Sequence, residues 1–136
     1  SRNLAMYRAL TGAMAKSLVS SAHDCSDGGL AVALAECCFG ADSGASIDLG
    51  PVMKDSDSLD KWGALFGESL GRILVSVKQE RREEFEMVMG GHSSHHIGSL
   101  PEGDDIIFSD TGEEILVTSM SEVRTAWKQA LDGGGV

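Results

Sequence analysis

The chain has 136 residues, of which 42% are apolar and 24% are charged, and this is typical of one globular domain with its own core. Its net charge of −10, from 21 Asp and Glu against 11 Lys and Arg, disfavours nucleic acids and anionic membrane surfaces as partners, because both bind to basic faces. No apolar run approaches the ~20 residues that a membrane-spanning helix needs, so we expect a cytoplasmic protein.

The first third of the sequence predicts two helices that are joined through a short strand and a glycine loop. Apolar residues three or four positions apart indicate a helix from Asn3 to Val19. The segment from Ala22 to Cys25 is expected to be extended. The run from Leu30 to Phe39 is nearly all apolar and rich in Ala, so we interpret it as a buried helix that ends at Gly40.

The middle of the chain predicts two strands separated by a loop and a short helix. Apolar and polar residues alternate from Gly44 to Leu49, which indicates a strand. The polar segment from Pro51 to Ser58 is expected to be a loop, and Leu59 to Phe66 to be a short helix. The clearest strand pattern is RILVSV, from Arg72 to Val77.

The last third predicts an amphipathic helix followed by strands. The helix is expected from Glu80 to Met89, and a weaker strand from His95 to Leu100. Two further strands, Asp104 to Phe108 and Glu114 to Thr118, are expected to pair around the turn Asp110-Thr111-Gly112.

Ser119 and Glu122 have the spacing of a capping box, which predicts the start of a final helix. The mixture of helices and strands predicts an α+β fold with a single mixed or antiparallel sheet and helices packed on it. We expect one domain over residues 1–136 with a disordered tail at 132–136. The absence of an initiator Met suggests a C-terminal fragment of a longer chain.

The three cysteines are Cys25, Cys37 and Cys38, an odd number with two of them adjacent. This pattern favours buried thiols in a reducing cytosol over a disulfide framework. Cys25 has no evident base partner, so we do not expect it to be a nucleophile.

The glycine loop from Asp24 to Gly29 is the first candidate binding segment. The backbone N–H groups of Gly28 and Gly29 would lie in the first turn of the following helix, where they suit a phosphate. Alternatively, Ser26 or Asp27 caps the helix, and Asp24 and Asp27 would repel an anion unless a cation intervened. From the residues alone, capping and turn geometry are the favoured interpretation.

The second candidate is Gly67-Glu68-Ser69-Leu70-Gly71-Arg72, which brings a carboxylate and a hydroxyl to the start of a strand. The alternative is a polar turn with a Glu–Arg surface pair, and the residues alone favour this turn. The cluster His92, His95 and His96 could bind zinc, but a glycine-rich loop without further ligand motifs favours a solvated segment, so we predict no metal site.

Two of these segments resemble one enzyme family. The string His23-Asp24-Cys25-Ser26-Asp27-Gly28-Gly29-Leu30, followed by AVALAE, is similar to the H-D-x-[SA]-[DE]-G-G-L signature in the second half of phosphoribosylformylglycinamidine synthase. The string LFGESLGRILVSV resembles that family's LF-x-E-S-Q-x-R-hhh-S-V element, and His96-Ile97-Gly98 lies where the family often has an I-G pair.

The resemblance implies the C-terminal domain fold of the aminoimidazole ribonucleotide synthetase-related superfamily. It also implies a ligase that uses ATP and Mg²⁺ to convert formylglycinamide ribonucleotide and ammonia to the amidine in purine biosynthesis. The implied partners are N-terminal ATP-binding domains of the same polypeptide and a glutaminase subunit that supplies ammonia. Most of the chemistry would then lie outside this chain, so we expect no catalytic residue and no tightly bound cofactor in it.

Within the matching element Glu68 and Ser69 agree with the family, whereas Leu70 replaces Gln and cannot form a side-chain hydrogen bond. The resemblance and the loop together predict a set of ligand- or phosphate-binding residues: Asp24, Ser26, Asp27, Gly28, Gly29, Glu68 and Ser69. The alternative is a non-catalytic structural or interaction module of the same fold with a degenerate pocket.

Overall fold

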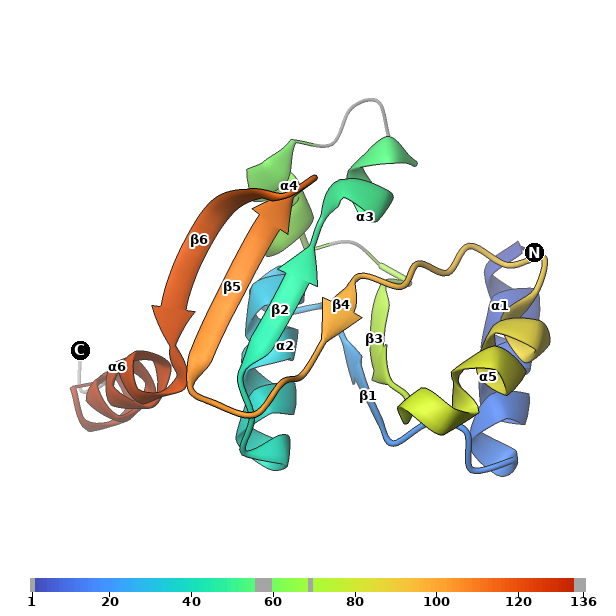
Figure 1. Ribbon diagram of the computed structural model, residues 1–136, viewed down its shortest axis with the longest axis horizontal. Coiled ribbons are helices and arrows are strands. Elements are labelled where there is room, and N and C mark those ends of the chain that lie inside the picture. The colour runs from blue at the N-terminus through green and yellow to red at the C-terminus, as the bar shows by residue number, and fades with distance from the viewer. Residues whose placement is uncertain (1, 56–59, 69, 134–136) are drawn as a thin grey trace.

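The computed structural model describes residues 2–55, 60–68 and 70–133 and contains two sheets with helices around them (Figure 1). The helices are α1 (Arg2–Ala15), α2 (Gly29–Ala41), α3 (Gly50–Lys54), α4 (Lys61–Phe66), the 3₁₀ helix η1 (Gln79–Arg81), α5 (Arg82–Met89) and α6 (Met120–Asp132). The strands are β1 (Ser21–Asp24), β2 (Ala45–Asp48), β3 (Ile73–Ser76), β4 (Gly98–Ser99), β5 (Asp105–Asp110) and β6 (Glu113–Ser119).

The α+β class is confirmed, but the prediction of a single sheet is wrong. Strands β1 and β3 form a separate antiparallel pair, in which Ser21 lies opposite Ser76 and Asp24 opposite Ile73. The larger sheet has the order β4-β2-β5-β6, with β2 and β5 parallel and the other pairs antiparallel. Neither β1 nor β3 pairs with a strand of the larger sheet.

Helix α2 lies against one face of the larger sheet and forms the centre of the core (Figure 1). Its residues Leu34 and Cys38 share the buried core with Ile47 of β2 and Phe108 of β5. Burying each large aliphatic or aromatic side chain of this kind contributes about 1.5–3 kcal/mol. The nearly continuous apolar sequence of α2 is therefore explained by burial on most sides.

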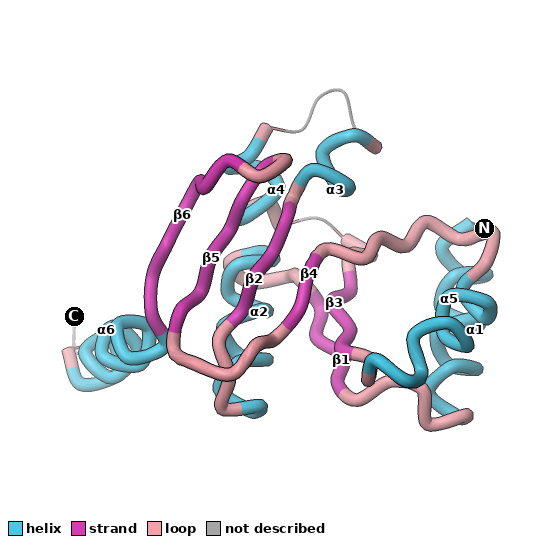
Figure 2. Tube along the Cα trace, in the orientation of Figure 1, coloured by secondary structure: helices cyan, strands magenta, loops and turns pink. Residues whose placement is uncertain are grey.

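Helices α1 and α5 pack against each other on the far side of the β1–β3 pair, where Leu10, Leu18 and Met89 are buried. A long loop leads from α5 back to β4 and connects this helix pair to the larger sheet (Figure 2). In the described part of the chain, no helix has the length and apolar character that crossing a membrane requires.

Several predicted boundaries are corrected by the structure. Helix α1 ends at Ala15 rather than Val19, and Ser17 adopts a positive φ of 56° in the turn that follows. The segment expected to be a loop from Pro51 contains α3, in which Pro51 occupies the first turn, a position that tolerates its missing N–H. The weak strand expected from His95 is only the two-residue β4.

The C-terminal predictions are largely confirmed. Strands β5 and β6 form the expected hairpin, with Thr111 at φ 53° and Gly112 at φ 88° in its turn. The Ser119–Glu122 capping box starts α6 as predicted. Helix α6 extends to Asp132 and Gly133 follows it, while residues 134–136 lie outside the described part, as do residues 56–59.

Candidate functional site

The glycine loop turns the chain sharply from β1 into α2. Gly28 is the N-cap residue of α2 with φ 80°, and Gly29 has φ 71°, so both occupy the left-handed region that favours glycine. A Cβ atom on Gly29 would lie 2.7 Å from the carbonyl carbon of Phe66. Glycine is therefore required here because the start of α2 lies directly on the backbone at the end of α4.

Glu68 caps this loop from a distant part of the sequence. Its Oε1 accepts a hydrogen bond from the backbone N–H of Gly28 at 3.0 Å. No side chain of the loop itself makes the N-cap hydrogen bond, so the interpretation of Ser26 or Asp27 as the cap is wrong. A carboxylate at this position is stabilised by the unpaired N–H groups and by the positive end of the helix dipole.

Arg72 holds the two segments in this arrangement. Its guanidinium donates hydrogen bonds to the carbonyl oxygens of Ala64 at 2.8 Å and Gly67 at 3.2 Å, at the C-terminal end of α4. Its own carbonyl oxygen accepts from the N–H of Cys25 at 3.0 Å. Instead of the surface pair with Glu68 that the sequence suggested, Arg72 therefore joins α4, β3 and the glycine loop.

These segments enclose a pocket of about 470 Å³ at the end of the β1–β3 pair. It is lined by Tyr7, Asp24, Cys25, Ser26, Asp27, Glu68, Leu70, Gly71, Arg72 and Ile73. Three acidic residues and one arginine thus line a common pocket next to the first turn of α2. The apolar side chain of Leu70 is fully exposed at this pocket.

The structure brings together most of the predicted site residues. Asp24, Ser26, Asp27 and Glu68 line the pocket, and Gly28 is bonded to Glu68, whereas Gly29 is buried against α4. Ser69 lies outside the described residues. Sequence reasoning did not predict Tyr7 as a lining residue, because its apolar spacing indicated only a place on the first helix. Arg72 belongs to the second candidate segment, but it was considered only for a surface pair with Glu68.

Cys25 lines the pocket and is buried. Burial raises the pKa of its thiol, and the nearby Arg72 guanidinium opposes this rise only in part. A thiol with a raised pKa is a poor nucleophile at neutral pH. The expectation that Cys25 is not a nucleophile is consistent with this environment.

One residue of the histidine cluster, His95, contacts Asp55, which directly follows α3. His95 Nε2 lies 2.8 Å from Asp55 Oδ2, and the hydroxyl of Ser93 donates to the same carboxylate oxygen at 3.4 Å. Among residues 2–55, 60–68 and 70–133 there is no group of three or more His, Cys, Asp or Glu side chains that could hold a metal ion.

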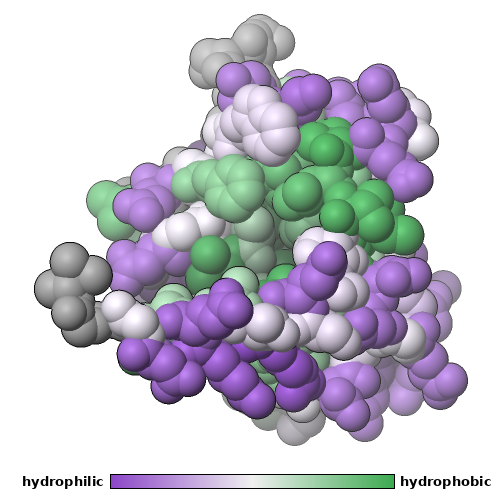
Figure 3. Space-filling view, turned by 90° about the vertical axis from the view of Figure 1, so that its left-hand side faces the viewer, coloured by the Kyte–Doolittle hydropathy of each residue, from purple (hydrophilic) through white to green (hydrophobic). Residues whose placement is uncertain are grey.

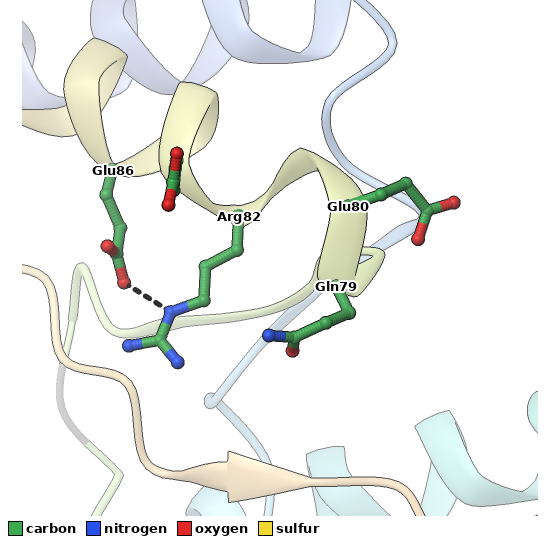
Figure 4. A pocket seen from close by; sticks show the side chains of 5 residues that line it. Gln79, Glu80, Arg82 and Glu86 are labelled. Atoms are coloured by element: carbon green, nitrogen blue, oxygen red, sulfur yellow. Dashed lines mark hydrogen bonds and ion pairs between the residues drawn. The ribbon is translucent and has the colours of Figure 1, made fainter.

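A second hollow of about 510 Å³ lies along η1 and α5 (Figure 4). Its charged side chains include Glu80, Arg82 and Glu86, and the Nε atom of Arg82 donates to Glu86 Oε1 at 2.8 Å. This is an exposed ion pair between residues four apart on a helix, which contributes only about 0.3–0.5 kcal/mol. None of the predicted site residues lines this hollow, so the glycine-loop pocket is the better candidate site.

Comparison with known proteins identifies relatives of this arrangement. The family model described as AIR synthase related protein, C-terminal domain, matches residues 2–126. The chain is 34% identical over 131 residues to phosphoribosylformylglycinamidine synthase subunit PurL of Prochlorococcus marinus. It is 37% identical over 126 residues to the subunit of that name from Limosilactobacillus reuteri. These matches cover 90% and 93% of the chain but only 16% of each relative.

Solved structures show the same fold. A structure of T. maritima PurL complexed with FGAR superimposes with a TM-score of 0.80 at 17% identity, over 89% of this chain and 20% of that chain. T. maritima PurL complexed with ATP gives a TM-score of 0.77 at 18% identity, over 86% of this chain and 20% of that one. Since the family model spans nearly the whole sequence and the fold agrees, the chain belongs to the AIR synthase related protein, C-terminal domain, family.

Proposed function

We propose that this chain is the C-terminal domain of a phosphoribosylformylglycinamidine synthase, a purine-biosynthesis ligase that uses ATP to convert formylglycinamide ribonucleotide and glutamine-derived ammonia to the amidine. The observation that carries the proposal is the hydrogen bond between Glu68 and Gly28, which joins the two family-like segments into one pocket. The curated relatives that share 34% and 37% identity with the chain support it.

The role proposed for the pocket is to shape the site and contact ligand rather than to catalyse. Its ligand-binding candidates are Asp24, Ser26, Asp27, Gly28, Gly29, Glu68 and Ser69. Three observations favour a non-catalytic role for the pocket. The N–H of Gly28 already donates a hydrogen bond to Glu68, the side chain of Leu70 has no hydrogen-bonding group, and the Cys25 thiol has a raised pKa. The isolated chain is therefore expected to show no ligase turnover.

The nucleotide and metal are assigned to the whole enzyme. Structures of T. maritima PurL with ATP, ADP and AMPPCP support ATP as the nucleotide. Mg²⁺ would accompany ATP, but the described residues do not fit a resident metal, because they contain no cluster of three possible ligands. We assign both to ATP-binding domains of the same polypeptide, which lie outside this chain.

The proposal includes a glutaminase subunit as a source of ammonia and a cytoplasmic location. A solved assembly described as PurLQS from T. maritima supports the existence of further subunits. Three buried free cysteines are consistent with a reducing compartment.

A chimera tests the proposal. The C-terminal domain of Limosilactobacillus reuteri PurL, to which this chain is 37% identical, is replaced by residues 2–133. The chimera should release ADP in the presence of ATP, formylglycinamide ribonucleotide and ammonia. A chimera that folds but carries Gly29→Val, which places a branched side chain against α4 at a φ of 71°, should lose this activity.

The same relative without the exchanged domain is the negative control, and it should be inactive. An active deletion, or a folded chimera that binds the substrates and never turns over, would contradict the assignment.

A further inference from the structure

The edge of the larger sheet at β6 is the longest unpaired strand edge in the described part of the molecule. Strand β6 has seven residues and pairs with β5 on one side only. The opposite edge of that sheet is β4, which has two residues, and β1 and β3 have four each. An edge strand of this length presents a row of backbone N–H and C=O groups to which another extended segment can hydrogen-bond.

The centre of this edge is apolar. Ile115, Leu116 and Val117 follow one another: Ile115 and Leu116 are partly buried against the core, and Val117, opposite Ile107 of β5, is 54% exposed. Branched residues of this kind favour extended pairing, and the strand contains neither proline nor lysine, the residues that commonly block an edge. Figure 3, in which this side of the molecule faces the viewer, shows hydrophobic surface in the middle bordered by hydrophilic surface.

Both ends of the edge are acidic. Near the hairpin turn lie the carboxylates of Asp110, Glu113 and Glu114, and near the start of α6 lie those of Asp104, Asp105 and Glu122. Hydrogen bonds from backbone groups fix two of them, because Asp104 accepts from the N–H of Ser121 and Glu122 accepts from that of Ser119. The neighbouring cation Arg124 is paired with a different carboxylate, because its Nη2 lies 3.2 Å from Oδ1 of Asp42.

We propose that the β6 edge is a docking site for an extended segment of another protein that has an apolar, β-branched centre and Lys or Arg at both ends. The backbone of that segment would extend the sheet by one strand, and its terminal cations would meet the acidic ends of the edge. This surface is separate from the glycine-loop pocket, and the inference does not rest on the proposed ligase function.

A second copy of the chain fits this edge poorly. In an antiparallel pair centred on Leu116, Glu113 of one copy would lie opposite Ser119 of the other, close to Glu122. A parallel pair would place the glutamates of β6 beside each other. Each chain also carries a net charge of −10, so two copies repel each other. The acidic ends therefore disfavour pairing with a second copy and favour pairing with a basic strand.

The test uses two labelled peptides of about nine residues with the same alternating Val-Thr centre, one with Lys pairs and one with Glu pairs at its ends. Fluorescence anisotropy with the chain should show binding of the Lys-ended peptide at least about tenfold tighter than that of the Glu-ended peptide. Amide exchange should slow within residues 113–119. The variant Glu113→Lys/Glu114→Lys should lose most of this preference.

The matched control is Glu83→Lys/Glu84→Lys, which makes the same charge change on the exposed face of α5, and it should keep the preference. Circular dichroism shows whether each variant is folded. Equal binding of the two peptides, binding of neither, protection outside β6, or a dimer formed through β6 would each overturn the proposal.

Discussion

At Gly29 the backbone conformation and the lack of space both require glycine. Its φ is 71°, and a Cβ would approach the backbone of Phe66 and Leu65 to 2.7–2.8 Å. Substitution Gly29→Ala should therefore lower the free energy of unfolding by about 2–6 kcal/mol, the sum of left-handed strain and overpacking. Urea unfolding followed by circular dichroism measures the change.

Gly12 provides the matched control for this substitution. It lies within α1, and an added Cβ would meet nothing within 4 Å. Gly12→Ala should stabilise the chain by about 0.5–1 kcal/mol, because alanine loses less backbone entropy in a helix. A Gly29→Ala variant as stable as the wild type would show that α2 does not lie directly on α4.

The contact between Glu68 and Gly28 predicts a smaller effect. Glu68→Ala removes the acceptor of the Gly28 N–H and should cost about 0.5–1.5 kcal/mol, whereas Glu68→Gln keeps an acceptor oxygen and should cost less. Amide exchange of Gly28, followed by NMR, should accelerate in the alanine variant. Unchanged exchange in that variant would rule out Glu68 as the cap of α2.

The site shows what could be predicted at the scale of single residues. The sequence identified Glu68 and the glycine loop as candidates, because their residue types and spacing can be recognised within short segments. It did not indicate that Glu68 contacts Gly28, 40 positions away, or that Arg72 donates to the carbonyls of α4. Such contacts depend on how β1 and β3 pair, and no local pattern specifies that pairing.

The start of α6 is an element whose stability depends on one side chain. Ser119 Oγ accepts from the N–H of Glu122 at 3.1 Å, and Glu122 accepts in return from the N–H of Ser119. Ser119→Ala should lower the free energy of unfolding by about 1 kcal/mol, while Ser119→Thr keeps the cap and should be nearly neutral. Equal losses in both variants, measured by urea unfolding, would contradict a capping role.

The junction between β2 and the β5–β6 turn predicts a pH dependence. Asp48 Oδ1 accepts from the N–H of Gly50 at 2.9 Å and of Thr111 at 3.0 Å, and these bonds hold the pKa of Asp48 below its ordinary value. A lowered folded-state pKa adds stability above the unfolded-state pKa, and this stability is lost as pH falls through the folded-state value.

The stability difference between wild type and Asp48→Asn should therefore be constant near neutral pH and shrink below about pH 4. Thermal unfolding across this range measures it, with Asp27→Asn in the glycine loop as a control. A difference that persisted undiminished at the lowest pH would contradict a contribution from the ionised carboxylate.

Elements with local signals were predicted well, and their assembly was not. The capping box, the β5–β6 hairpin and the buried α2 each follow from residues close in sequence. The division into two sheets depends on pairings between strands that are distant in sequence: β2 joins β5, and β1 joins β3. The sequence did not predict helix α3, because the segment around Pro51 is polar and polar segments indicate loops. The only helix signal there is the proline itself, which is common in the first turn of a helix.

At the scale of the whole molecule, one hydrophobic core cluster surrounds α2, and further buried apolar residues, among them Leu10 of α1 and Met89 of α5, lie outside it. The glycine-loop pocket lies on the β1–β3 pair, so its geometry depends on the packing of α2 against that pair. Substitutions that loosen α2 should therefore disturb the pocket as well as the core.

The reactivity of the three cysteine thiols measures how tightly the residues around α2 are packed. Cys37 and Cys38 lie on α2 and Cys25 directly follows β1, and their exposed fractions are only 7%, 0% and 3%. Burial, with Cys37 beside it, raises the pKa of Cys38 to about 11, and burial also raises that of Cys25. All three thiols should react slowly with a thiol reagent in the folded chain and rapidly once urea unfolds it.

The labelling rate should follow the unfolded fraction as urea increases, because a buried thiol reacts through opening of the structure. The exposed position Ser94→Cys provides the control, since a thiol there should react at once in the folded chain. Rapid labelling of one native cysteine without urea would locate an opening in the packing around α2. If that cysteine were Cys25, its thiol would be accessible in the pocket that it lines, and the buried position of Cys25 would be refuted.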